Sequence, residues 1–414
     1  MDEISRRRFL RVVGTAAAAP ALAQLLAACG GTPERAGTAS AAKLSANATK
    51  VKVGFIALTD NASIVMAKEL GYFAQRDLDV TLEKQASWPV TRDNLLNGQI
   101  DAAHCLYSMP ASVAAGVGGK GERSLKIAMG LNSNGQAITL AKSLKDAGYG
   151  DLEQAKAALQ KSQPTVAMTF PGGTHDLWVR YWLKAMGLDG STIKIIPIPP
   201  PQMVANMETG TCQAYCVGEP WGAVAVQKGI GFTHLTSQDI WSQHPEKALV
   251  VSERFATQQP EALQRMIGAI LQSSKWLDNL PNRTQAAQVL GTPSYVNAPA
   301  ADIESRLLGR YTIGEGLPNK SYVDDAMRFY RDGKVNAPQR AHTIWALTQF
   351  RRLGLPTAEV PVQEIADQLV LRDVYEKAAA AEGVDVPDDM QPFEVRLDKT
   401  TFDPRNPNEE ATRL

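Results

Sequence analysis

The sequence is poor in cysteine and has no excess of either charge. Lysine plus arginine and aspartate plus glutamate both number 43, so no net field would attract nucleic acid or a charged membrane surface. The four cysteines are Cys29, Cys105, Cys212 and Cys216. Cys212 and Cys216 lie in a strand-like run, where residues four apart are about 13 Å apart and cannot form a disulfide. We therefore expect buried thiols and no disulfide framework in the folded part of the chain.

The motifs of common catalytic and cofactor sites are also missing. The chain contains no H-E-x-x-H, G-x-S-x-G or P-loop sequence, and we identify no nucleophile–base pair. His104-Cys105 and Cys212-x-x-x-Cys216 lack the second pair that a metal site would need. Residues 116–121 fit G-x-G-x-x-G, but they follow a predicted helix, whereas a dinucleotide fingerprint follows a strand and opens a helix. These absences favour binding over catalysis, and we expect neither an enzyme nor a cofactor nor a metal.

The N-terminus carries two adjoining export signals. Residues 5–11, Ser-Arg-Arg-Arg-Phe-Leu-Arg, match the twin-arginine pattern. The alanine-rich run that follows is broken by Pro20 and is too interrupted to span a membrane. Residues 26–30, Leu-Ala-Ala-Cys-Gly, match a lipoprotein cleavage box in which the Cys29 thiol receives the lipid. A disordered leader with incidental arginines is the alternative, but two signals in the right order favour twin-arginine export and a lipid anchor facing the periplasm or the cell exterior.

The rest of the chain divides into a tether and a body of two α/β lobes. Residues 1–28 are the expected signal peptide, and residues 29–50 are too poor in large apolar side chains to fold, which is typical of a tether. Strands and helices then alternate in two series, which predicts mostly parallel sheets flanked by helices. The expected boundaries are 51–140 for the first part of lobe 1, 141–245 for lobe 2, 246–390 for the return to lobe 1 with C-terminal helices, and 391–414 for a polar tail on the surface.

Several strand-to-helix junctions are candidate ligand sites in a cleft between the two lobes. At residues 170–176 a strand runs through two glycines into a helix, which aims backbone N–H groups of Gly173 and Thr174 and the positive helix end at the cleft. This arrangement suits an anion, and His175 could add a side-chain donor. The alternative is an ordinary turn with an incidental histidine. Gly218, at a second junction of this type, would let a ligand approach the backbone closely.

Three further side chains could reach the same cleft. Trp88 follows the second predicted strand, and its indole N–H is a donor without an acceptor. Gln136 lies at the expected crossing between lobes, and Lys247 lies near the return crossing, where it could neutralise a buried anion. Taken singly, each is as readily explained by packing or by a solvated loop.

The same segments resemble one protein family, the nitrate-, nitrite- and bicarbonate-binding proteins of ABC importers. The resemblance covers most of the chain after residue 51. The segments that carry it are Val53–Asp60, Ala86–Trp88, Arg92–Leu95, Asn134–Leu140, Thr169–Trp178, Pro199–Met207, Val217–Trp221 and His244–Leu249. The resemblance implies a two-lobed periplasmic-binding-protein fold of type II, with the ligand bound in a cleft between the lobes.

The resemblance also implies a site and a function. The nitrate site of the family falls on Trp88, Gln136, His175, Gly218 and Lys247. Nitrate is a planar monoanion that only accepts hydrogen bonds, so we expect a pocket of donors with one positive charge. The implied partners are nitrate or nitrite, the permease and ATPase subunits of an ABC importer, and the membrane through the lipid anchor, with no nucleic acid.

The resemblance leaves alternatives open. The bicarbonate branch is expected to use a calcium ion and to have an acidic residue where Lys247 stands, so the lysine disfavours it. A cytoplasmic nitrate sensor would lack the twin arginines and Cys29. A binding protein for another small solute, such as cyanate, a sulfonate or a pyrimidine, is the remaining rival, and an enzyme built on the same clamp comes after it.

Overall fold

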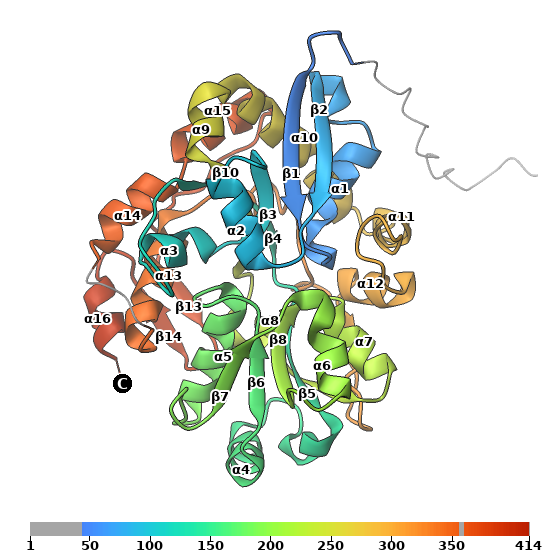
Figure 1. Cartoon of the computed structure of the whole chain (residues 1–414), viewed down its shortest axis with the longest axis vertical. Helices are drawn as coiled ribbons and strands as arrows, with labels where there is room; N and C mark the ends of the chain where they lie inside the picture. Colours follow the sequence, from blue (N-terminus) through green and yellow to red (C-terminus); the bar gives the residue numbers. More distant parts are fainter. Residues whose placement is uncertain (1–43, 356–359, 414) are drawn as a thin grey trace, which may run out of the picture. The chain divides into compact units, whose positions relative to one another are not determined.

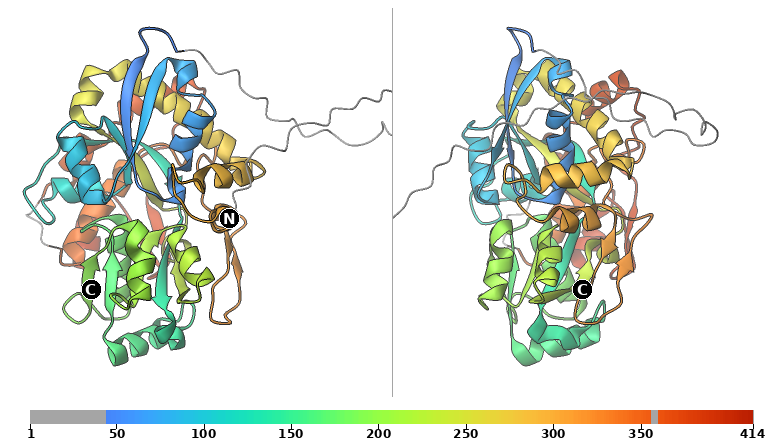
Figure 2. Two further views of the ribbon diagram at one scale, coloured as in Figure 1. Left: turned by 45° about the vertical axis from the view of Figure 1, so that its right-hand side comes forward. Right: turned by 90° about the vertical axis from the view of Figure 1, so that its right-hand side faces the viewer.

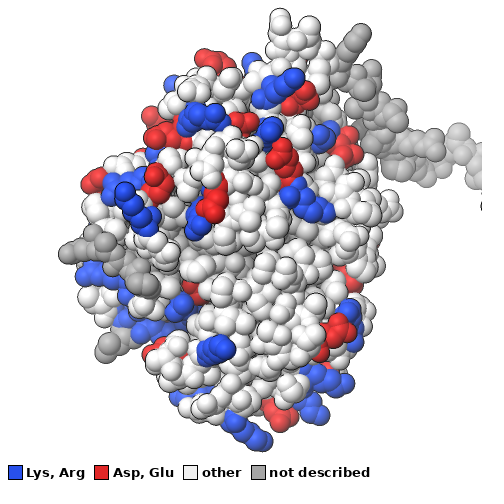
Figure 3. All heavy atoms as spheres, in the orientation of Figure 1, with Lys and Arg blue, Asp and Glu red and all other residues white. Residues whose placement is uncertain are grey.

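The computed structural model describes residues 44–355 and 360–413, which contain two five-stranded sheets (Figure 1). The predicted signal peptide, Cys29 and most of the tether at 29–50 lie outside the described residues. Within the described residues, no helix combines the length and the apolar character needed to cross a membrane. Charged side chains of both signs are interspersed over the face drawn in Figure 3, in keeping with their equal numbers.

The first sheet has the strand order β2-β1-β3-β10-β4. Its strands are β1 (Thr49–Phe55), β2 (Leu78–Lys84), β3 (Ala102–Leu106), β4 (Leu125–Ser133) and β10 (Pro245–Ser252). β1 runs parallel to β2 and β3, and β10 runs antiparallel to β3 and β4. All residues of β3 and β4 are buried, as expected for strands that are covered on both faces. The covering helices include α1 (Ala62–Glu69), α2 (Trp88–Leu96), α3 (Met109–Ala114) and α10 (Pro260–Asp278).

The second sheet has the strand order β7-β6-β8-β5-β9. Its strands are β5 (Gln136–Ala141), β6 (Thr165–Met168), β7 (Lys194–Pro197), β8 (Ala214–Gly218) and β9 (Gly231–Thr236). β6 runs parallel to β7 and β8, whereas β5 runs antiparallel to β8 and β9. The helices of this lobe include α4 (Leu152–Ser162), α5 (Thr174–Ala185), α6 (Met203–Glu208), α7 (Trp221–Gln227) and α8 (Ser237–Ile240). The two views of Figure 2 show β1 to β4 of the first sheet (blue to cyan) and the second sheet (green) in separate lobes.

The chain crosses between the lobes at two places. The first crossing consists of Asn134 and Gly135, whose φ angles of 63° and 99° turn the backbone sharply between β4 and β5. The return crossing follows α8 and ends where β10 begins at Pro245. The sequence-based boundary at residue 140 therefore needs correction, since β5 pairs with β8 and belongs to lobe 2. Gln136, which was expected at the crossing, is the first residue of β5 and directly follows it. The hydrophobic pattern did not mark the boundary, because every residue of β4 and β5 is buried.

The segment after β10 contacts both lobes. It contains α9 (Glu253–Gln258), α10, α11 (Asn282–Leu290), α12 (Ala300–Leu307) and the short strands β11 (Arg310–Tyr311) and β12 (Lys320–Ser321). α10 packs on α1 in lobe 1, whereas α12 packs on α7 in lobe 2. The second contact includes a buried ion pair in which Arg306 Nε lies 3.0 Å from Glu219 Oε1.

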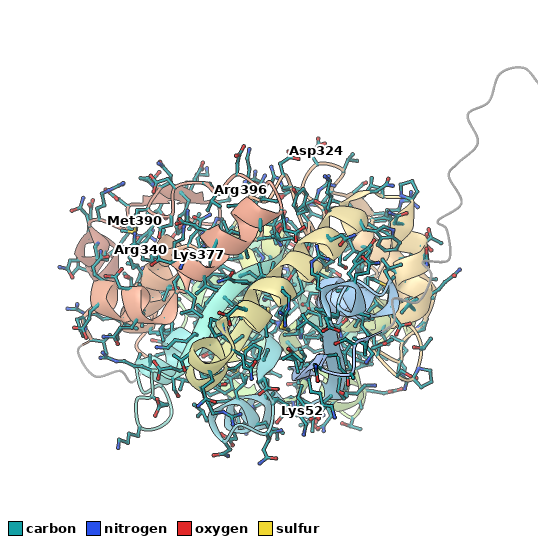
Figure 4. The ribbon with its side chains drawn as sticks, turned by 90° about the horizontal axis from the view of Figure 1, so that it is seen from above. Lys52, Asp324, Arg340, Lys377, Met390 and Arg396 are labelled. Carbon is teal, nitrogen blue, oxygen red and sulfur yellow. The ribbon has the colours of Figure 1, made fainter. Side chains whose placement is uncertain are left out.

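The C-terminal elements are α13 (Arg340–Arg352), α14 (Val362–Leu369), α15 (Arg372–Ala381), the hairpin β13–β14 (Phe393–Val395 and Thr400–Phe402) and α16 (Pro407–Thr412). α13 packs against α3 of lobe 1 and α5 of lobe 2. Arg340, labelled in Figure 4, ties α13 to Asp367 and Asp389 at 2.8 and 2.6 Å.

The predicted polar tail at 391–414 does not lie entirely on the surface, because part of it packs into the core. Val395 and Phe402 of its hairpin are 1% exposed and join the apolar core of lobe 2. The stacked ring of Phe393 lies 4.2 Å from that of Trp241. Each strand of the hairpin has only three residues, too few for its alternation to be recognised in a polar sequence.

Candidate functional site

The five predicted ligand residues come from both lobes and are all buried. Trp88 opens α2 and Lys247 lies in β10 of lobe 1, whereas Gln136 (β5), His175 (α5) and Gly218 (β8) belong to lobe 2. Trp88 and Gln136 begin their elements and Gly218 ends its strand, whereas His175 and Lys247 are the second and third residues of theirs. Gln136 and Gly218 are direct neighbours in the pairing of β5 with β8.

Lys247 links the contributions of the two lobes. Its ammonium lies 5.8 Å from the centre of the Trp88 ring and 2.8 Å from Asp60 Oδ2. It also donates to Glu246 Oε1, which lies 3.6 Å from His175 Nε2. The ammonium therefore lies next to residues of η1 (Thr59–Asn61) and α2, and it is linked to α5 through Glu246.

Gly218 allows a close approach between the lobes. A Cβ atom at this position would lie 2.9 Å from Asp60 Oδ2, closer than real Cβ atoms come, and 3.3 Å from Leu58 Cδ2, which is a tight contact. Any larger residue here would push against the carboxylate that holds Lys247. Gly218 was predicted to let a ligand approach the backbone; the close neighbours that the structure shows are lobe 1 side chains.

Two polar atoms of the predicted set have no hydrogen-bond partner among the described residues. They are Trp88 Nε1 and His175 Nε2, both fully buried. His175 Nδ1 lies 2.6 Å from Thr169 Oγ1; when that hydroxyl donates to Nδ1, Nε2 carries the proton and can donate. Burial, followed by the charge of Lys247, lowers the pKa of His175 well below its ordinary value, so the imidazole is neutral at pH 7. Unpartnered buried donors of this kind are the groups that an anion would satisfy.

The glycine turn before α5 has a packing role in the structure. The Gly173 N–H donates to Phe170 O at 2.9 Å, and the Gly172 N–H donates to Asp176 Oδ2 at 2.8 Å. The expectation of a free Gly173 N–H facing the cleft therefore needs correction. A Cβ at Gly173 would lie 2.6 Å from Leu106 Cδ1 of lobe 1, so this glycine lets the lobes approach. Thr174 accepts a 3.0 Å hydrogen bond from Gln136 Nε2 and orients that amide.

Two carboxyl groups contact one of the predicted ligand residues, Lys247, and were missed by the sequence reasoning. Asp60 and Glu246 are both 0% exposed and both contact Lys247. The expectation of a pocket of donors alone does not describe this arrangement. Both residues lie inside segments that carry the family resemblance, and their position beside strand ends was the signal that could have found them.

The two carboxyl groups differ in their electrostatics. Burial acts to raise the pKa of Asp60, but Lys247 and a 2.6 Å contact with His104 Nε2 lower it to about 2. Burial raises the pKa of Glu246 to about 8, with Lys247 opposing the rise. The pKa of Lys247 itself is raised, because these carboxyl groups outweigh its burial. At pH 7 the cluster therefore holds an ammonium, an aspartate and a largely protonated Glu246.

Other features of the sequence have structural roles. Cys105, Cys212 and Cys216 are buried free thiols, which confirms that expectation for the described residues. The G-x-G-x-x-G run lies between α3 and β4, with positive φ at Gly116 and Gly118, and forms the predicted turn. Among the described residues, no group of three or more His, Cys, Asp or Glu side chains is placed to hold a metal ion.

A cavity of about 320 Å³ lies beside the two crossings rather than at this cluster. It is bounded by Asn132 and Ser133 of β4, by Trp241 before β10, and by residues of the C-terminal segment. None of the five predicted ligand residues lines it.

Comparison with known proteins adds independent information. The model of the NMT1-like family matches residues 45–291. The chain is 38% identical to the nitrate/nitrite binding protein NrtA of Nostoc sp. strain PCC 7120, over 100% of this chain and 99% of that protein. The crystal structure of the periplasmic nitrate-binding protein NrtA from Synechocystis PCC 6803 superimposes with a TM-score of 0.84 at 35% identity, covering 89% of this chain and 99% of that one. The bicarbonate-binding protein CmpA of Synechococcus elongatus is 26% identical over 98% of this chain and 96% of that protein.

Proposed function

Since the chain belongs to the NMT1-like family and is similar over its full length to nitrate/nitrite-binding proteins, we propose that it captures nitrate or nitrite and delivers it to an ABC importer. The fold of such a binding protein is the two-lobed α/β fold described above. The same role requires no catalysis, and we propose a binding protein rather than an enzyme.

The observation that carries this proposal is the convergence of buried donors from both lobes around Lys247. Trp88 Nε1 and His175 Nε2 are buried without partners among the described residues, and Lys247 supplies the positive charge. A ligand held by donors of both lobes favours their closed arrangement, which is how a clamp protein signals that it is loaded.

The donor set is sufficient for useful affinity. A hydrogen bond to a charged group is worth roughly 1.5–3 kcal/mol, and micromolar binding needs about 8 kcal/mol. Four or five donors reach this value after the costs of association. We propose that Trp88, Gln136, His175, Lys247 and the backbone of Gly218 are these donors.

Bicarbonate is the alternative ligand within the same family. A calcium-dependent bicarbonate site would need acidic ligands at the corner that Lys247 occupies. Asp60 and Glu246 are acidic, but the ammonium lies between them, and two cations cannot share that position. The higher identity to nitrate/nitrite-binding relatives than to the bicarbonate-binding one supports the same choice.

Export and anchoring belong to the same proposal. We propose that residues 5–11 direct export by the twin-arginine route and that Cys29 carries the lipid that holds the protein at the membrane. Labelling cells with a radioactive fatty acid tests the anchor, because Cys29→Ala would abolish label in the protein. Label that persists in this variant would contradict the assignment.

Titration calorimetry with three anions tests the function. The protein without residues 1–28 is titrated with nitrate, nitrite and bicarbonate, each with and without calcium. We expect calcium-independent nitrate or nitrite binding, lost in Lys247→Ala and retained in Lys142→Ala, whose side chain is 63% exposed. Calcium-dependent bicarbonate binding with no nitrate signal would refute the proposal.

A further inference from the structure

The carboxyl group of Glu246 lies among the donors proposed for the anion. Its Oε1 contacts the Lys247 ammonium and lies 3.6 Å from His175 Nε2. Its Oε2 has no hydrogen-bond partner among the described residues, although the side chain is fully buried. A carboxylate and a nitrate ion are both planar groups that offer oxygen acceptors to the same donors. An ionised Glu246 would therefore compete with the anion for Lys247 and His175.

The charges of the cluster make this competition severe. Asp60 already pairs with Lys247 at 2.8 Å, so the ammonium and the aspartate form a neutral pair. An added anion next to an ionised Glu246 would leave three negative charges around one ammonium at a site that is 0% exposed. Like charges in such a site cannot all remain ionised, and one of the acids has to bind a proton.

Glu246 is the group that can bind this proton. Asp60 is held as an anion by Lys247 and His104, which lower its pKa to about 2. The pKa of His175 and that of His104 are lowered by burial, so these rings resist protonation. Burial raises the pKa of Glu246 to about 8, well above that of the other carboxyl.

The remaining titratable neighbours do not change this assignment. They are His244 before β10, Cys105 and Tyr107 at the end of β3, Asp176 of α5, and Cys216 and Glu219 of β8. Asp176 pairs with Arg180 at 2.8 Å, and Glu219 pairs with Arg306 at 3.0 Å. Burial keeps the Cys105 and Cys216 thiols and the Tyr107 phenol protonated, because it raises the pKa of each. Burial lowers the pKa of His244 to about 3, so its ring is neutral.

We infer that the anion binds only with Glu246 protonated, and that the protonated carboxyl donates its O–H to the anion as a further ligand contact. The proton comes from the solvent and stays on the Glu246 carboxyl, and no other bond forms or breaks. This inference rests on the proposed function, since it assigns a new contact and a co-bound proton to the same site.

The affinity for the anion should therefore depend on pH in a specific way. Below about pH 8, Glu246 already holds the proton, so anion affinity is constant and binding takes up no further proton. Above about pH 8, the proton must be bound together with the anion, and affinity falls by up to about tenfold per pH unit. Lys247 does not cause this fall, since its pKa is raised above that of an ordinary lysine.

Calorimetry in pairs of buffers with different enthalpies of ionisation measures the proton directly. Nitrate is titrated into the wild-type protein at about pH 6.5 and about pH 9; we expect an uptake near zero at the lower pH and approaching one proton at the higher. Glu246→Gln carries a neutral N–H donor in place of the O–H, so its nitrate affinity should be independent of pH, with no uptake. Glu153→Gln, an exposed substitution in α4, should behave as the wild type.

Each outcome has a separate meaning. Nitrate binding with the same affinity and no proton uptake at either pH would overturn the inference, and so would proton uptake that persists in Glu246→Gln. Neither result depends on the other, because the wild-type measurement stands even if the variant fails to fold. Absence of nitrate and nitrite binding at both pH values would instead refute the proposed function.

Discussion

Replacement of Lys247 by methionine tests the buried ion pairs that organise the site. Methionine keeps the length of the side chain and removes its charge, so the change leaves Asp60 without its cation at 2.8 Å. Removing one partner of a buried ion pair costs about 3–5 kcal/mol. Burial acts to raise the pKa of Asp60, yet Lys247 and His104 lower it from 3.8 to about 2, so the carboxylate depends on these two neighbours to stay ionised. We therefore expect Lys247→Met to lower the free energy of unfolding by about 3 kcal/mol.

Urea unfolding at pH 7, without added anion, measures this loss. Lys142→Met is the matched control, because its side chain is 63% exposed and exposed substitutions usually change stability by less than about 0.5 kcal/mol. The double variant Lys247→Met with Asp60→Asn removes both charges and should recover part of the lost stability. A loss below about 1 kcal/mol in Lys247→Met would refute the reasoning, because it would mean that the carboxylate is solvated and does not depend on this ammonium.

Three other predictions follow from the same geometry. Lys247→Ala should lose more nitrate affinity in calorimetry than Gln136→Ala, because it removes the cation proposed to neutralise the anion. The reverse order would contradict the charge assignment. The pKa of Glu246 is raised from 4.5 to about 8, so its contribution to stability is fully present below pH 4.5 and is lost as the pH rises to about 8. Glu246→Gln should therefore flatten the decline of the unfolding free energy over this pH range. An unchanged decline would mean that another group causes it. Gly218→Ala should weaken nitrate binding at least tenfold, because the added Cβ would lie 2.9 Å from Asp60 Oδ2. Gly119→Ala is the control and should have wild-type affinity, since there is open space around that position.

Much of the fold was predictable because it depends on local order along the chain. Alternating buried strands and helices indicated two α/β lobes, and the structure has two five-stranded sheets with flanking helices. The lobe boundary at residue 140 was less accurate, although Gln136 was expected at the crossing, since β4 and β5 are separated by only two residues and are both buried throughout. The β13–β14 hairpin was also missed, because three-residue strands leave almost no periodic signal.

The five predicted ligand residues came from single segments and from the family resemblance. The structure buries all five, and Lys247 with its carboxyl partners lies between the contributions of the two lobes. Gly173 was chosen for its backbone N–H, but that group is bonded to Phe170 O and the glycine instead admits Leu106 of the other lobe. Sequence identifies a residue suited to a turn, whereas contacts from the other lobe decide how that residue is used.

The sequence by itself determined the order of the elements, the glycine-rich junctions and the residue types available to bind an anion, because these depend on neighbours a few positions apart. Only the tertiary structure decided the charge state of the site. Asp60 and Lys247 are 187 positions apart, and their 2.8 Å contact exists because strand β10 returns to the first sheet. Burial and unlike neighbours then separate two carboxyl groups into one held as an anion and one that binds a proton near pH 8. Such a difference arises from the loss of water around each group and from its distance to other charges, and neither quantity exists before the chain is folded.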